Sequence, residues 1–118
     1  MTRKELNDAR KKKLAESLKV GAFVKNVWGA TMRRVNYWEI IAIDKTRVTL
    51  RSASIDGDPS PNCAHSEVTL LGSNPQSTNL VYATTRMGYL LKEGESLKDY
   101  WSTYEFINVG DKTSCWSD

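Results

Sequence analysis

The segment Val20–Ser52 constrains the fold of this chain more than any other, because it reads as three short strands joined by tight turns. In residues 35–43, β-branched and aromatic residues dominate an alternating pattern that is typical of a strand. Apolar residues occupy both alternating sets of positions, so we expect this strand to lie at the centre of a curled sheet. Residues 47–52 alternate more simply and predict a half-buried strand with one basic, solvated face.

The remaining sequence predicts a helix and several further short strands. Thr2 and Glu5 fit a capping box, which predicts a helix over residues 3–18. Prolines, glycines and polar residues mark loops at 53–66 and 72–79. Further short strands are predicted at 68–71, at 81–91 with an interruption at Gly88, and at 104–107. Turns recurring every ~8–12 residues favour a mainly β (α+β) fold, with five or six strands curled into a small antiparallel barrel.

Length and composition indicate one ordinary globular domain. The chain has 118 residues, with 40% hydrophobic and 26% charged residues. We expect a basic helix at 1–20 followed by a single barrel domain at 21–118. No apolar run is long enough for a membrane span and the N-terminus has no apolar signal region, so we expect residence in the cytoplasm. Two cysteines are too few for a disulfide framework.

Charge is distributed unevenly along the chain. Residues 1–20 carry seven Lys or Arg against three Asp or Glu, whereas the rest carries ten basic and eleven acidic residues. The basic excess therefore lies in the N-terminal helix, with a run at Lys11, Lys12 and Lys13. Such asymmetry is typical either of a polyanion-binding arm or of a solvated surface helix.

Catalytic and metal-binding patterns are weak, and we expect no enzyme activity and no cofactor. The single histidine, His65, lies two residues after Cys63 in a proline-rich loop. A structural zinc site needs four ligands, usually in paired spacings, and this chain shows no such pairs. The glycines are isolated and form no phosphate-binding loop. No small-molecule substrate is indicated.

Basic and aromatic residues occur together in the strand region. Arg33 and Arg34 fall in the predicted loop before residues 35–43, and Trp38 lies within that strand. Arg47 and Arg51 share one face of the next strand. Basic side chains attract phosphates and aromatic rings accept stacked bases, so these residues form the predicted site, with Lys11–Lys13 as an auxiliary arm. Because adjacent residues face opposite ways, we expect one of Tyr37 and Trp38 to be buried and the other exposed.

Several motifs resemble a family of small proteins encoded by bacteriophages and plasmids. They are Val20-Gly21, Trp28-Gly29, and the run of two aromatics, Glu and two Ile at 37–41. The resemblance spans most of the chain, but only Trp28–Ile43 is specific, and residues 30–34 depart from the polar stretch of the family. It implies a mobile-element origin, a bacterial host and an SH3-like barrel, and it implies no reaction.

Two functions follow as expectations. The first is nucleic-acid binding through the basic and aromatic residues. The second is a phage-encoded inhibitor that docks on a host protein, such as a component of a defence system. The abundance of Trp, Tyr and Arg supports this alternative, since these residue types anchor protein interfaces.

Overall fold

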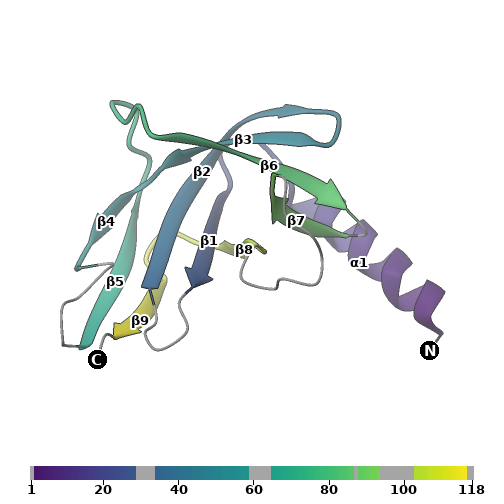
Figure 1. The fold of residues 1–118 in the computed structure, drawn as a ribbon, viewed down its shortest axis with the longest axis horizontal. Helices are drawn as coiled ribbons and strands as arrows, with labels where there is room; N and C mark the ends of the chain where they lie inside the picture. Colours follow the sequence, from purple (N-terminus) through teal and green to yellow (C-terminus); the bar gives the residue numbers. More distant parts are fainter. Residues whose placement is uncertain (1, 29–33, 59–64, 87, 94–102, 117–118) are drawn as a thin grey trace.

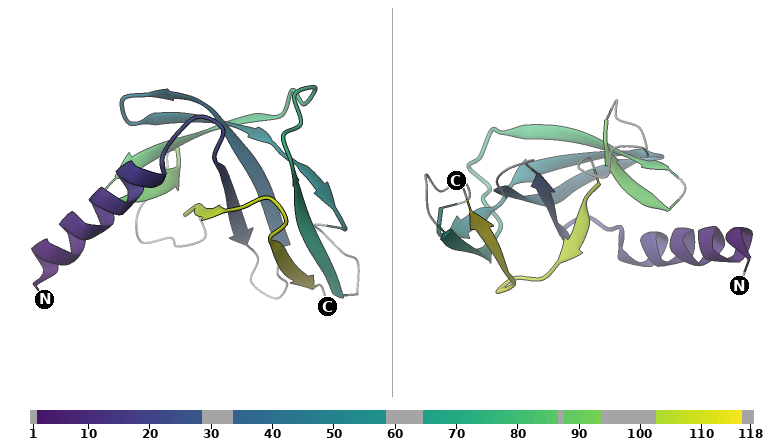
Figure 2. Two further views of the ribbon diagram at one scale, coloured as in Figure 1. Left: turned by 180° about the vertical axis from the view of Figure 1, so that it is seen from behind. Right: turned by 60° about the horizontal axis from the view of Figure 1, so that its bottom comes forward.

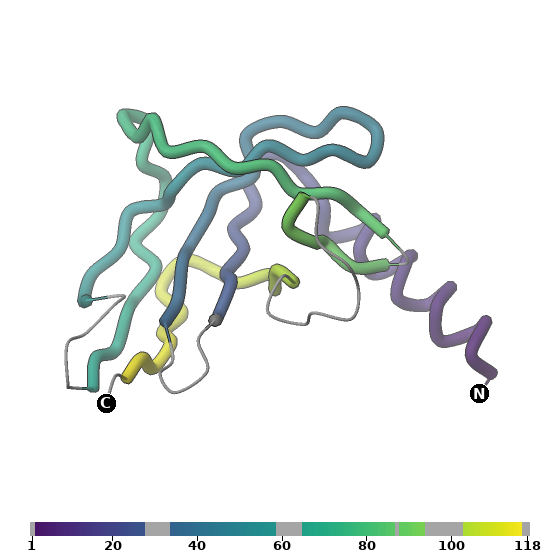
Figure 3. The backbone as a smooth tube through the Cα atoms, viewed as in Figure 1, coloured from purple at the N-terminus to yellow at the C-terminus, as the bar shows by residue number. Residues whose placement is uncertain are grey.

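The computed structural model describes residues 2–28, 34–58, 65–86, 88–93 and 103–116. This part of the chain forms one helix and two antiparallel sheets (Figures 1 and 3). The larger sheet has the strand order β7-β6-β3-β2-β1-β8 and the smaller has β4-β5-β9. The elements are α1 (Arg3–Ser17), β1 (Phe23–Trp28), β2 (Arg34–Asp44), β3 (Arg47–Ser52), β4 (Ser54–Asp56), β5 (His65–Gly72), β6 (Leu80–Arg86), β7 (Tyr89–Lys92), β8 (Glu105–Ile107) and β9 (Lys112–Trp116).

The six-stranded sheet curls until its two edges meet. Leu91 in β7 forms an antiparallel bridge with Thr103, just before β8. The N–H of Tyr104 donates to the carbonyl of Leu90 at 2.9 Å. These bonds join β7 to the segment just before β8, so the two edges of the sheet are linked there. The predicted fold, an N-terminal helix and a small curled antiparallel barrel, is confirmed.

Strand β2 lies at the centre of the barrel sheet, between β1 and β3. Both of its faces are buried at Tyr37–Ile40, as the apolar residues at both sets of positions predict, whereas Ala42 and Ile43 near the end of the strand are exposed. Tyr37 is 4% exposed and Trp38 is 8% exposed. The prediction that one of these rings faces solvent is therefore wrong. The two faces of β2 pack against two different hydrophobic cores. Adjacent residues such as Tyr37 and Trp38 point in opposite directions, and both are therefore buried.

The two cores lie on opposite faces of the central strands. Core 1 is enclosed by the barrel, and core 2 lies between the barrel sheet and the sheet β4-β5-β9. The buried members of core 1 are Val24, Trp38, Ile40, Val48, Leu50, Ala83, Leu90 and Tyr104. The buried members of core 2 are Val35, Tyr37, Ala53, Val68, Leu70 and Cys115.

The smaller sheet corrects one sequence-based prediction and adds a strand, β9, that the sequence did not predict. Residues 53–66 were expected to form a loop, but Ser54–Asp56 form β4 and β5 begins at His65. Strand β9 follows the turn at Gly110 and pairs with β5 from Thr69↔Lys112 to His65↔Trp116. Its five residues alternate between exposed and buried side chains, a pattern too short to identify without its partner strand.

Helix α1 begins with the predicted capping box. The N–H of Glu5 donates to Thr2 Oγ1 at 3.2 Å, and the N–H of Thr2 donates to Glu5 Oε2 at 3.4 Å. No residue of the helix is fully buried, although Leu14 and the cap residue Leu18 pack against core 1. The C-terminal end of α1 therefore rests on the barrel, while its N-terminal end projects away from it (Figure 2).

Candidate functional site

The two arginines predicted on β3 share one face, and each is engaged by a carboxylate of the same protein. Arg51 Nη2 donates to Glu39 Oε1 at 2.8 Å, with both side chains largely buried. Arg47 Nε donates to Glu93 Oε2 at 3.0 Å in the open. The guanidinium of Arg47 also lies 3.9 Å above the centre of the Tyr82 ring. Much of the positive charge on β3 is therefore balanced within the fold.

The other residues predicted around this face do not join it. Trp38 belongs to core 1, which leaves its ring no open side for stacking. Arg34 is the first residue of β2, whereas Arg47 pairs opposite the last residue of that strand, Asp44. At about 3.3 Å per residue these arginines lie roughly 30 Å apart along the sheet. Arg33 lies outside the described residues.

The lysines of α1 are placed very differently. Lys11, Lys12 and Lys13 are all exposed. Within the part of the chain that the structure describes, no ion pair involves any of them. At about 100° per residue, Lys12 lies roughly 160° around the helix from Leu14 and so points away from the barrel. Lys11 and Lys13 flank the apolar side of the helix.

The helix is fixed against the β6–β7 hairpin at Gly88. This residue has φ +84°, and a Cβ there would lie 2.6 Å from Cγ and 2.9 Å from the carbonyl carbon of Arg10. Only glycine therefore lets the helix backbone approach so closely. Arg10 completes the contact, because its guanidinium carbon lies 4.4 Å from the ring centre of Tyr89 and Nη1 donates to Asn7 Oδ1 at 3.1 Å.

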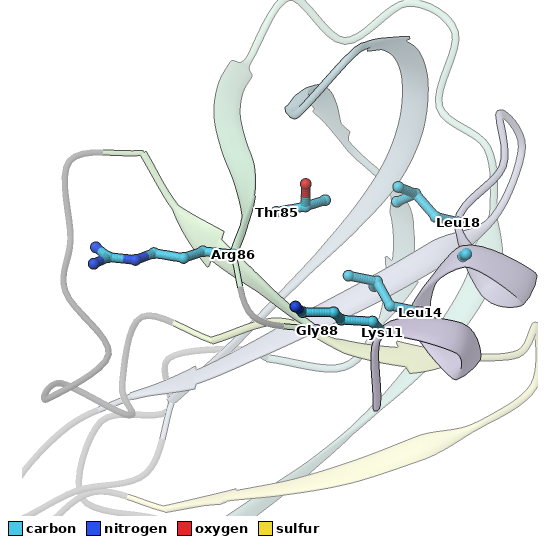
Figure 4. Close-up of a pocket in the computed structure, with 7 residues that line it drawn as sticks. Lys11, Leu14, Leu18, Thr85, Arg86 and Gly88 are labelled. Carbon is cyan, nitrogen blue, oxygen red and sulfur yellow. The ribbon is translucent and has the colours of Figure 1, made fainter. Parts of the chain in front are cut away.

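This docking brings Lys11 beside Arg86. Both residues line one pocket of about 290 Å³ between α1 and the hairpin (Figure 4). The sequence did not identify Arg86 as a site residue, because Lys11, with which it lines the pocket, is distant in the chain. The interruption of the strand pattern at Gly88 was the available signal, since it marks a hairpin end. We call Arg3, Lys4, Lys11, Lys12, Lys13 and Arg86 the α1 surface.

Two buried tyrosines, Tyr104 in core 1 and Tyr37 in core 2, remain neutral at physiological pH. Burial raises the pKa of Tyr104, which lies under the other side of α1, to about 12. Burial also raises the pKa of Tyr37 in core 2, although the hydrogen bond with Thr113 opposes that rise. The Tyr37 hydroxyl lies 2.8 Å from the Val68 carbonyl and 2.7 Å from Thr113 Oγ1. Tyr104, the one of the two that lies beside α1, therefore supplies no anion to balance the lysines of the helix.

Comparisons with known proteins give this chain no relative: no family model, no curated protein and no solved structure matches it. Among the described residues, no group of three or more His, Cys, Asp or Glu side chains is arranged to hold a metal ion. No helix in the described ranges has the length and apolar character needed to cross a membrane. Cys63 of the weak Cys63–His65 pair lies outside those ranges.

Proposed function

We propose that this protein binds nucleic acid without catalysing a reaction, and that the α1 surface is its contact region. The observation that carries the proposal is the run Lys11–Lys13, which is exposed and has no ion pair in the described structure. Concentrated cations release the counterions condensed on a polynucleotide when they approach its phosphates. Lys12 lines neither pocket between the helix and the barrel, and Lys11 and Lys13 lie at the rims of these two pockets with exposed side chains.

The kind of recognition follows from which groups are available. Lysine ammonium groups contact phosphates as point charges and carry no base information. Among the aromatic rings beside the helix, Tyr89 is already covered by the guanidinium of Arg10, Tyr104 belongs to core 1 and Phe106 packs against that core. Phosphate contacts without base stacking favour binding that depends little on sequence and strongly on salt. Trp38 offers no face for a stacked base, because its ring is in core 1.

The test compares two variants that each remove two positive charges. Lys12→Ala/Lys13→Ala changes the α1 surface, and Arg47→Ala/Lys112→Ala changes exposed cations that already face a carboxylate. Binding of a labelled oligonucleotide duplex is followed by fluorescence anisotropy between ~50 and ~200 mM salt. We expect the helix variant to reduce the slope of log affinity against log salt by about 2. The control variant should keep the slope of the parent protein.

Absence of duplex and single-strand binding by the parent protein at the lowest salt would overturn the proposal. Equal losses in both variants would overturn the assignment to α1. Circular dichroism of both variants checks that the helix and sheets are intact, because charge removal from exposed positions should leave the fold unchanged.

A second candidate is docking on a host protein by a protein of phage or plasmid origin. The observation that favours it is the outer face of β6, where Leu80 is 44% and Tyr82 is 41% exposed beside Arg47. Arginine and tyrosine are common anchors of interfaces. Tyr82→Ala should then abolish capture of one stoichiometric host protein from nuclease-treated lysate, whereas Lys12→Ala/Lys13→Ala should not. If the Tyr82→Ala variant captures the host protein as well as the parent does, the outer face of β6 is excluded as the docking surface.

A further inference from the structure

The pocket between α1 and the β6–β7 hairpin separates apolar from charged groups. Leu14, Ala15 and Leu18 of the helix segment form its apolar wall. Thr85, Arg86 and Gly88 line the opposite side, and Lys11 completes the lining. In Figure 4 the two leucines lie toward one end and the Lys11 amine points toward the other, where the Arg86 side chain begins and extends outward, away from the leucines.

The chemistry of the lining defines the ligand class. No described lining residue carries a negative charge, so Lys11 and Arg86 favour an anion at their end. No described lining residue is aromatic, and the wall offers only methyl and methylene groups. An aliphatic chain matches such a wall, because its affinity comes from removal of apolar area from water and needs no stacking.

We propose that this pocket binds an aliphatic chain with a single anionic head group, the chain lying on Leu14 and Leu18 and the head group at the end lined by Lys11 and Arg86. This ligand class differs from the polynucleotide assigned to the α1 surface. The site shares Lys11 and Arg86 with that surface, but Leu14, Ala15 and Leu18 belong to the pocket alone. The two assignments can therefore be tested separately.

The size of the pocket sets the length of the chain. A water molecule takes up about 30 Å³, and a methylene group is of similar size, so a volume of about 290 Å³ accommodates about ten carbons. A medium-length chain such as octanoate fits this limit. Each further methylene that enters the pocket should strengthen binding about fourfold, until the wall is covered.

The experiment is a calorimetric titration of the full-length protein with butyrate, hexanoate and octanoate, below the concentrations at which they form micelles. We expect affinity to rise with chain length, and octanol and octyltrimethylammonium to bind more weakly than octanoate. Ala15→Phe should fill the pocket and reduce octanoate affinity at least about tenfold. Lys11→Ala and Arg86→Ala should each weaken it about two- to fivefold, as expected for partly exposed charges.

Lys12→Ala is the matched control, because it removes one lysine of the same helix that does not line the pocket. Octanoate affinity that matches butyrate affinity would overturn the proposal, as would octanoate binding that survives Ala15→Phe. Ala15→Phe should leave duplex binding unchanged, whereas Lys12→Ala/Lys13→Ala should leave octanoate binding unchanged. If octanoate does not bind but the duplex does, only the proposal for the pocket is overturned. If the duplex does not bind but octanoate does, only the proposal of nucleic-acid binding is overturned.

Discussion

Strand β3 and helix α1 both carry several positive charges, but the fold uses them in opposite ways. On β3, Arg51 is held by Glu39 and Arg47 is held by Glu93 and stacked on Tyr82. On α1, Lys11–Lys13 are exposed and have no ion pair in the described structure. Cations that are already paired stabilise the fold, whereas cations without partners are available to an external anion.

The difference has a physical origin in the number of neighbours. A residue of a central strand has cross-strand partners on both sides, so Arg51 lies directly opposite Glu39 on one strand and Leu80 on the other. Opposite charges at such positions stabilise each other. A helix that meets the barrel along only one side leaves most of its circumference without neighbours. Basic residues are therefore structural on β3 and available for binding on α1.

The buried pair gives the largest expected effect. Arg51→Ala leaves the carboxylate of Glu39 buried without its partner, and we expect a loss of about 3 kcal/mol in the free energy of unfolding. Urea denaturation measures this loss. The double variant Glu39→Leu/Arg51→Leu should lose clearly less, because it leaves no charge unpaired. A loss below about 1 kcal/mol for Arg51→Ala would mean that the Glu39–Arg51 pair contributes no more to stability than an exposed ion pair. The distinction between structural cations on β3 and available cations on α1 would then be weaker.

The docking of α1 provides the next largest effect. Gly88→Ala introduces a Cβ at a positive φ and against the backbone of Arg10, so we expect a loss of about 2 kcal/mol. Relative to the parent protein, Gly88→Ala should increase the amide hydrogen exchange rate more in α1 than in β2. Gly110→Ala is the matched control, because its φ is also positive but no atom lies within 4 Å of the added Cβ. Equal losses in the two variants would mean that backbone strain alone, and not the helix contact, requires Gly88.

The sequence predicted those features that depend on local pattern. The Thr2–Glu5 capping box and the burial of both faces at Tyr37–Ile40 were visible, because each is encoded within a few consecutive residues. The same logic failed for Tyr37 and Trp38. Opposite directions were correctly assigned to them, but the second core depends on β5 and β9, which are far away in the chain.

The candidate site was predictable only in part. The basic excess of residues 1–20 could be counted directly, and it identified Lys11–Lys13. The neutralisation of Arg47 could not be seen, because Glu93 lies 46 residues further along and reaches it only through the β3-β6-β7 order. Arg86 escaped notice for the same reason, since only the docking of α1 brings it to Lys11. The number of charged residues can be counted in a sequence, but their ion-pair partners are identified only from the folded structure.

The exposed arginine of β3 should have a smaller effect than the buried one. Arg47→Ala removes an exposed ion pair and a stacking contact, so we expect a loss of about 1 kcal/mol or less. Arg47→Lys should recover the charge interaction but lose the planar stacking on Tyr82. Urea denaturation measures both variants, and duplex anisotropy should not change. Duplex binding that weakens as much as in Lys12→Ala would place the β3 face in the nucleic-acid contact after all.

The smallest expected effect concerns Tyr104, which lies beneath α1 close to Lys13. Its pKa is raised from 10.0 to about 12 by burial, so between these values the folded protein keeps a proton that the unfolded chain has lost. The stability that this group contributes is complete below pH 10 and is lost as the pH rises through about 12. Tyr104→Phe should therefore move the alkaline unfolding midpoint, followed by circular dichroism, to higher pH. Tyr82→Phe, at an exposed ring, is the control and should leave the midpoint in place. A midpoint that moves down in Tyr104→Phe would show that the hydroxyl is needed in the folded state, and it would make this tyrosine an active partner of the helix instead of a neutral neighbour.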